Sequence, residues 1–300
     1  MQHRNFSVLD ILLLYLLLEA NMRADSKTVE RTKRLTSALK NEQTTMVAKY
    51  VVSIRSNKPQ IIFGDNHFCV GSIVAPRFVL TAAKCTMTNR KVKHTLRSIV
   101  VVGGTPNRLI SVKDTVTKKV QRVFVSDKYI KRSTNNIALL KLEGSWPTDN
   151  PSIQIISLPK GAPNYGISYM VLGWGRMFKG GPLTGNLVHV FVKLMDRKTC
   201  LSMVKTLYPE MLCAGNFDVD GDNSPCAGDT GGPMIDSNNT LVAIVSHRLG
   251  CGSWSTPSLY TDVWYHMEWI NDTITNASSP TAARCCILLF MFSLIFLTVK

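Results

Sequence analysis

The sequence predicts an all-β fold, with its strands arranged as a closed antiparallel barrel or a sandwich. Many short apolar runs follow one another with Gly, Pro and Asn between them, and no period of repetition is present. A turn-rich segment over residues 144–164 divides these runs into two halves. Numerous short strands separated by turn signals are typical of barrels and sandwiches. The length of 300 residues suffices for one large β domain or two smaller ones.

The expected strands are short runs rich in Val, Ile, Leu and aromatic residues. Six lie before the turn-rich segment and four lie after it. They cover residues 50–54, 68–74, 78–83, 98–104, 120–125, 136–142, 169–175, 187–194, 241–247 and 258–263.

The centre of the turn-rich segment places an internal boundary near residue 150, with halves at roughly 49–150 and 151–262. Towards the end of the second half, Val263, Met267 and Ile270 recur at helical spacing. We therefore expect a short amphipathic helix over residues 262–275 that packs on the β body.

Both ends of the chain have the composition of processing signals. Residues 1–24 combine a weakly basic start with the apolar run VLDILLLYLLL, which predicts a cleaved secretory signal peptide and hence an extracellular protein. Residues 25–48 then form a linker. Residues 276–300 place small and polar residues before a terminal apolar run, as a glycosylphosphatidylinositol attachment signal does. A short tail anchor and an uncleaved apolar extension are the alternatives.

The formal net charge is +15, and its Lys and Arg residues are spread over many segments. The simplest interpretation is a generally cationic, soluble surface. A sharper one is attraction to acidic glycans, membranes or acidic proteins. Nucleic acid is not expected as a partner outside the cell.

In a secreted chain, cysteines are expected to form disulfides rather than to remain free. Six cysteines outside the tail allow fifteen connectivities, and their grouping in three close pairs favours the pairing of neighbours. Asn238 and Asn271 begin the glycosylation sequons NNT and NDT. The six cysteines are Cys69, Cys85, Cys200, Cys213, Cys226 and Cys251.

The segment 226–234, CAGDTGGPM, carries the most specific chemistry in the chain. Glycines on both sides of Asp-Thr permit a tight turn in which backbone N–H groups converge. Such a turn can stabilise a developing oxyanion.

With this segment in place, the chain resembles the trypsin/chymotrypsin family of serine proteases. Three motifs carry the resemblance, TAAKC at 81–85, NIALL at 136–140 and GDTGGP at 228–233, and the match covers roughly 49–274. GWG, LCAG and SLYTDV correspond in order as well. The resemblance implies a domain over 49–275 with two Greek-key β-barrels and a C-terminal helix. It also implies the disulfides Cys69 with Cys85, Cys200 with Cys213, and Cys226 with Cys251.

All three catalytic positions of the family differ in this chain. The base histidine falls on Lys84, the orienting aspartate on Asn136 and the nucleophilic serine on Thr230. A lysine with its ordinary pKa of about 10.4 is already protonated near neutral pH, and an asparagine cannot offset a developing positive charge. In such a triad, changing the aspartate to asparagine alone costs about 10⁴ in rate, and losing the serine or histidine costs about 2 × 10⁶.

The rest of the site is altered as well. Gly228, Asp229 and Thr230 would be the remnant of the oxyanion hole. Basic residues ending at Arg34 predict a processing site, but no Ile-Val-Gly-Gly tetrad follows it. The positions of the specificity pocket are occupied by Ser224, His247, Arg248 and Ser258, which do not indicate a trypsin-like preference for basic side chains.

These departures predict a pseudoprotease, a secreted or surface-tethered serine protease homologue without catalytic activity. We expect it to bind an extracellular protein, such as an active protease or its substrate, as a regulator, cofactor or decoy. Two alternatives stay open: a weak serine-type endopeptidase that uses Thr230 with Lys84, and a polyanion-binding module on a protease scaffold. We expect no cofactor and no metal.

Overall fold

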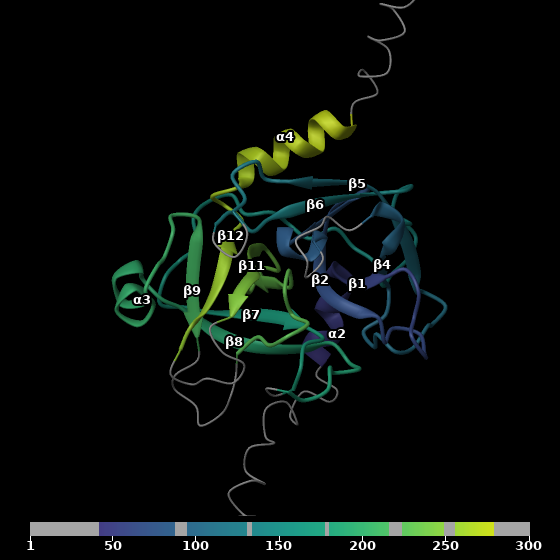
Figure 1. The fold of residues 1–300 in the computed structure, drawn as a ribbon, viewed down its shortest axis with the longest axis horizontal. Helices are drawn as coiled ribbons and strands as arrows, with labels where there is room; N and C mark the ends of the chain where they lie inside the picture. Colours follow the sequence, from purple (N-terminus) through teal and green to yellow (C-terminus); the bar gives the residue numbers. More distant parts are fainter. Residues whose placement is uncertain are drawn as a thin grey trace, which may run out of the picture.

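A computed structural model describes residues 42–87, 95–130, 134–177, 180–215, 224–248 and 256–278, with only the backbone of His247 and Arg248. Its strands form two closed antiparallel barrels that lie side by side (Figure 1). The first barrel contains β1 (Val51–Ser56), β2 (His67–Ala75), β3 (Phe78–Thr81), β4 (Ile99–Gly103), β5 (Val116–Val125) and β6 (Ala138–Leu142), in the order β1-β2-β3-β6-β5-β4.

The second barrel follows after the turn-rich crossover, as the sequence predicts. It contains β7 (Ser168–Gly173), β8 (Val188–Leu194), β9 (Met211–Gly215), β10 (Pro233–Ile235), β11 (Leu241–Arg248) and β12 (Ser258–Asp262), in the order β10-β11-β12-β9-β8-β7. The predicted all-β fold with two barrels and a C-terminal helix is confirmed.

Two strands were absent from the sequence prediction, β9 and β10. The strand β10 has only three residues, and its Pro233 and Met234 continue directly from the glycine-rich turn. Its pairing with β7 and β11 comes from the closure of the barrel, because three residues carry no periodic signal of their own. In β9, all five residues are buried, so no alternation marks it as a strand.

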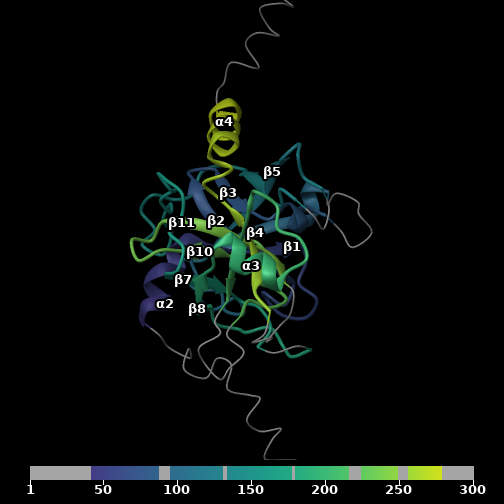
Figure 2. The ribbon, with the colours of Figure 1, turned by 90° about the vertical axis from the view of Figure 1, so that its left-hand side faces the viewer.

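Short helices complete the structure. They are α2 (Glu42–Val47), η3 (Ala48–Tyr50), η4 (Ala83–Thr86), η5 (Leu96–Ser98), α3 (Arg197–Met203) and α4 (Met267–Ser278). Figures 1 and 2 place α2 beside β7 and β8, and α4 at the opposite side of the molecule next to β5.

The C-terminal helix α4 begins at Met267 and ends at Ser278, whereas the sequence predicts 262–275. The difference at its start has a local cause. The Asp262 carboxylate accepts the N–H groups of Trp264 and Tyr265, at 2.8 and 3.3 Å, and holds this segment in a turn. The helix can therefore begin only after the turn has ended.

Residues 42–48, which were expected to form the end of the N-terminal linker, are helical together with Lys49 and Tyr50, so the strand expected at 50–54 begins at Val51. Thr44 and Val47 of α2 are buried, and the Thr44 hydroxyl lies 2.5 Å from Nδ1 of His189 on β8. This end of the segment therefore packs on the second barrel.

The apolar core spans the junction of the two barrels. Its largest cluster joins Ile54, Leu80 and Leu140 of the first barrel to Leu172 and Ile244 of the second. A backbone hydrogen bond of 2.9 Å from Val70 N–H to the Thr230 carbonyl also crosses the junction. The loops that carry the candidate site meet at this junction.

Several expectations concern segments outside the described residues. These are the signal peptide, the linker up to residue 41, the processing site at Arg34, and residues 279–300 of the tail. Within the described part of the chain, no helix combines the length and hydropathy that a membrane crossing would require.

Candidate functional site

Lys84 lies in the short helix η4, directly after the buried strand β3. Ala82 and Ala83 are fully buried, and Cys85 is bonded to Cys69 of β2. The Lys84 side chain is exposed. The disulfide and the buried alanines therefore fix the backbone at this position.

Asn136 precedes β6 and is 1 % exposed. Its Oδ1 accepts the backbone N–H of Lys84 at 2.9 Å, and its Nδ2 donates to the hydroxyl of Ser246 on β11, also at 2.9 Å. A backbone N–H can only donate, so the Oδ1 atom must face Lys84. The amide therefore ties the base position to the second barrel without placing a charge there.

Thr230 completes the constellation from the second barrel and is 5 % exposed. Its carbonyl oxygen accepts the Val70 N–H, and Sγ of Cys85 lies 3.6 Å from the same oxygen. The structure thus brings the three substituted positions to one place at the barrel junction, as the resemblance implies.

The turn around Thr230 has the conformation that its glycines permit. Gly228 and Gly231 have φ values of +102° and +81°, where a residue with a Cβ would be strained. A Cβ at Gly231 would also lie 2.2 Å from Oγ1 of Thr81 and 2.4 Å from the Val70 carbonyl oxygen. Within the described residues, the N–H groups of Gly228 and Thr230 donate to no other residue. Two free donors therefore remain where the family holds an oxyanion.

The carboxylate of Asp229 accepts two backbone N–H groups. Its Oδ1 accepts the Gly175 N–H at 2.6 Å, and its Oδ2 accepts the Cys226 N–H at 2.7 Å. A Cβ at Gly175 would lie 2.2 Å from Oδ2, which explains the second glycine of the GWG motif. Beside Asp229 lies a hollow of about 20 Å³, bordered also by Ser224 and His189. Its volume suits about one water molecule.

His67 was not among the predicted site residues. Its ring contacts the backbone of the turn at Gly228. Its Nε2 lies 3.1 Å from the Gly228 carbonyl and its Nδ1 lies 2.8 Å from the Ser53 hydroxyl. Because a carbonyl only accepts, Nε2 carries the proton and Nδ1 accepts from Ser53. Burial lowers the pKa of His67 to about 3, so the ring is neutral.

Arg55 extends this chain of hydrogen bonds. Its Nε donates to the Ser53 hydroxyl at 2.8 Å and its Nη2 donates to the Arg108 carbonyl at 2.9 Å. Burial first and the Arg108 charge second lower the pKa of Arg55 to about 10. In the sequence, the feature that could have drawn attention to His67 is its position two residues before Cys69. Its role depends on Gly228, which is 161 residues away in sequence.

The specificity-pocket positions are only partly described. Ser258 is buried at the start of β12, where it pairs in register with Ala214 and with the backbone of Arg248. The backbone of His247 pairs with Leu259. Ser224 borders the hollow beside Asp229.

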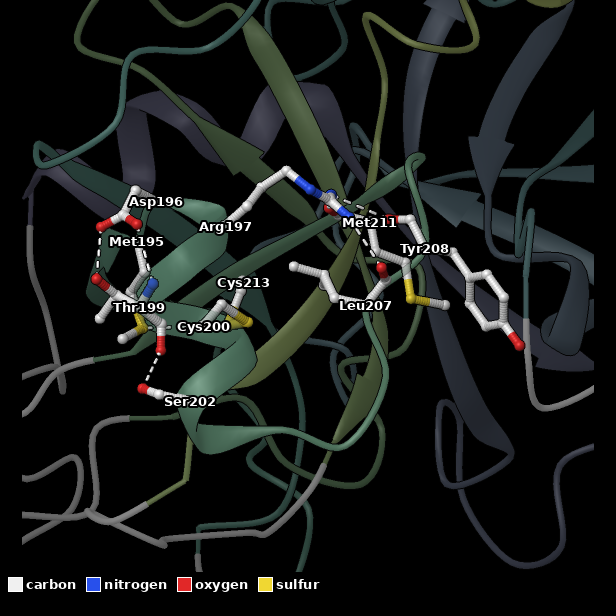
Figure 3. The surroundings of a disulfide bond; sticks show 10 residues. All are labelled: Met195, Asp196, Arg197, Thr199, Cys200, Ser202, Leu207, Tyr208, Met211 and Cys213. Carbon is white, nitrogen blue, oxygen red and sulfur yellow. Dashed lines mark hydrogen bonds between the residues drawn. A yellow bond between two sulfur atoms is a disulfide. The ribbon is translucent and has the colours of Figure 1, made fainter.

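Two of the implied disulfides are present, Cys69–Cys85 and Cys200–Cys213. Figure 3 shows the second, which holds the short helix α3 against β9. Cys226 is also disulfide-bonded, and its implied partner, Cys251, lies outside the described residues. The sequon asparagines Asn238 and Asn271 are exposed, as glycosylation would require.

The sequence model of the trypsin family matches residues 39–270, which is more than half of the chain. The chain belongs to the trypsin family. It is 32 % identical over 213 residues to trypsin Blo t 3 of Blomia tropicalis, covering 68 % of this chain and 76 % of the relative. It is 32 % identical over 215 residues to serine protease SP24D of Anopheles gambiae, covering 71 % and 74 %.

A third relative, bovine coagulation factor XII, is 31 % identical over 229 residues. The match covers 70 % of this chain but only 36 % of factor XII. The two barrels and their disulfides are thus those of a trypsin-family domain, and the family's motifs fall on the positions described above.

Proposed function

We propose that this trypsin-family chain has no proteolytic activity and acts by binding an extracellular protein. The observation that carries the proposal is the buried amide of Asn136, which bonds the Lys84 N–H and the Ser246 hydroxyl where a catalytic triad needs a carboxylate. These bonds keep the loop in place, so the scaffold can persist without the catalytic charge.

The three substitutions remove each function that the mechanism requires. A triad needs a neutral base, a carboxylate that stabilises the base once it is charged, and an unhindered hydroxyl. The amide of Asn136 supplies no charge. The extra methyl group of Thr230 restricts its side-chain rotamers, and it does so within a buried environment.

A pair of Thr230 and Lys84 is the alternative catalyst. A lysine becomes an effective base when burial disfavours its charged form. The exposed side chain of Lys84 does not have such an environment in the described structure. This argument favours binding over catalysis.

The partner that fits this proposal is an active extracellular protease or a protease substrate. A homologue with the family's scaffold can present the same loops as an active enzyme, and so can compete for, or assemble with, the same proteins. Disulfides in the domain support an oxidising, extracellular compartment.

The decisive experiment measures cleavage by the purified chain, both intact and processed after Arg34, against peptide libraries. We expect no cleavage above that of the Thr230→Ala variant, and no labelling of Thr230 by phosphonate probes. Cleavage that disappears in Thr230→Ala would instead establish the Thr230–Lys84 protease.

A positive control shows whether the scaffold could support catalysis at all. The triple variant Lys84→His, Asn136→Asp, Thr230→Ser restores the family's three side chains, whereas Lys84→His alone restores only one. We expect Lys84→His to remain inactive, because its imidazole would still lack both a carboxylate and a serine partner.

A further inference from the structure

A group of cations lies on the outside of the first barrel, on β5 and β6 and at the turn before β3. Lys119 and Arg122 of β5 are exposed, and Lys141 of β6 and Arg77 are half-buried. We propose that these four residues, the β5–β6 cationic face, bind a sulfated glycan. The proposal goes beyond the proposed function and holds whether or not the chain cleaves peptides.

The strand register places two of these cations directly opposite each other. Arg122 pairs with Lys141, next to a bulge between Val120 and Arg122. Val120 and Leu142 point into the core, so the exposed Arg122 lies on the outer surface. Like charges directly opposite on paired strands destabilise a sheet. A bound anion would remove this repulsion.

Neutral contacts hold the charges in place without cancelling them. Nζ of Lys141 donates to the Ala277 carbonyl near the end of α4 at 2.6 Å, and the Arg122 guanidinium lies 4.7 Å from the ring centre of Phe124. Arg77 donates to Oε1 of Gln121 at 3.0 Å. The face is therefore partly preorganised, which lowers the entropy cost of binding.

Acidic residues do not neutralise this face. Within the described residues, no ion pair joins any of the four cations to a carboxylate. The nearest acid in the strand register is the exposed Glu143, whose backbone N–H donates to the Lys119 carbonyl.

The kind of partner follows from the chemistry and the compartment. A row of fixed cations without an apolar pocket fits a polymer with repeated anionic groups rather than a folded hydrophobic surface. The anionic leaflet of cell membranes faces the cytoplasm, and the proposed location is extracellular. Sulfated glycans are the repeated anions that this location offers.

The experiment uses heparin as the probe and compares two double variants of the mature chain. Lys119→Gln with Arg122→Gln removes two charges from the face, and Lys193→Gln with Lys205→Gln removes two exposed charges from the second barrel. We expect affinity at physiological salt to fall about fivefold per charge, or roughly 30-fold, for the first pair. The second pair should lose less than about threefold.

Equal losses in the two pairs would overturn the proposal, since heparin would then respond to net charge alone. Two further arms test the kind of ligand. Desulfated heparin should bind weakly. Binding of polyglutamate or of anionic phosphatidylserine vesicles that depends on Lys119 and Arg122, while heparin binding does not, would also overturn it.

A stability measurement separates binding from misfolding. Heparin should raise the melting temperature of the wild-type chain more than that of the Lys119→Gln, Arg122→Gln variant. Without heparin, added salt should raise the melting temperature of wild type more than that of Arg122→Gln, because the variant lacks the repulsion from Lys141 that salt screens. An equal gain in both proteins would contradict the proposed repulsion.

Discussion

Asn136 is the residue on which the geometry of the altered site depends. It accepts from the Lys84 backbone and donates to Ser246, and its own carbonyl accepts the Thr261 hydroxyl at 3.2 Å. The contacts with Ser246 and Thr261 are buried, and the contact with Lys84 is partly buried. The side chain therefore has a structural role that is independent of any catalysis.

Replacing Asn136 with leucine should lower the free energy of unfolding by about 1–3 kcal/mol. The variant leaves the Lys84 N–H without its acceptor and the buried Ser246 hydroxyl without its donor, and an unpaired buried polar group costs about that much. Chemical denaturation measures the change. Ser246→Ala is the control, because it removes only the bond to Ser246 and keeps the acceptor for Lys84, and it should lose less. A leucine variant as stable as wild type would show that these bonds contribute little.

His67 makes the stability of the chain depend on pH. Its folded pKa of about 3 lies below its ordinary value of 6.5, so the unfolded chain binds the extra proton between these values. Stability due to His67 is complete above pH 6.5 and falls as the pH is lowered, by about 1.4 kcal/mol per unit. His67→Gln lacks this loss. The stability difference between wild type and His67→Gln should therefore shrink by about 2 kcal/mol from about pH 7.5 to about pH 5.

Other groups titrate in the same range but cancel in this comparison. Burial lowers the pKa of His266 to about 4 and raises that of Asp262 to about 6. The shift at His266 lowers the stability of the chain as the pH falls. The shift at Asp262 raises this stability as the pH falls from about 6 to 3.8, the ordinary pKa of the carboxyl group. Both are present in the two proteins. A difference that does not change with pH would mean that His67 is not held neutral.

At the scale of the elements, α3 is a short helix that depends on its cap and its disulfide. The Asp196 carboxylate accepts the Thr199 N–H at 2.9 Å and the Thr199 hydroxyl at 2.6 Å (Figure 3). At the other side, Arg197 donates to the Leu207 and Tyr208 carbonyls. Seven residues are too few to form a stable helix alone.

Asp196→Ala should lower the free energy of unfolding by about 1 kcal/mol, the usual cost of losing an N-cap. Thermal or chemical denaturation measures it. Asp196→Asn keeps an oxygen acceptor at the cap and should lose only a few tenths of a kcal/mol. If both variants lose equally, the charge of Asp196 matters rather than its hydrogen bonds.

The elements also show where sequence patterns are informative. The runs at 68–74, 98–104 and 136–142 each coincide over most of their length with a strand, because apolar residues bounded by turn residues have few other stable conformations. The strand β10 and the start of α4 could not be read in this way. The strand β10 depends on its two partner strands. The start of α4 depends on the Asp262 carboxylate, which accepts a backbone N–H from a residue that the helical pattern would include in the helix.

At the scale of the whole molecule, the net charge of +15 acts against the compact state. Raising sodium chloride from about 20 to about 200 mM should therefore raise the melting temperature, since it screens repulsion over about 10 Å. Differential scanning fluorimetry measures this. The Lys119→Gln, Arg122→Gln variant should gain less from salt, and an unchanged melting temperature in wild type would show that the charges are too far apart to matter.

The candidate site was predictable in part from sequence. The order of the motifs placed Lys84, Asn136 and Thr230 together, and the structure brings them to one junction. The contributions of His67, Ser53 and Ser246 could not be predicted, because each acts through a hydrogen bond to a residue in another strand or loop. Such partners become visible only once the barrels are closed.

The neutral amide at Asn136 has a further consequence for how this chain can change. An active member of the family must keep a carboxylate desolvated at this junction, and burying a charge is costly. A chain with an amide there does not have this desolvation cost, and its loops stay in position. Under the proposed function, loss of activity would widen the range of mutations that the fold tolerates, and the loops of this chain would be free to diversify for recognition.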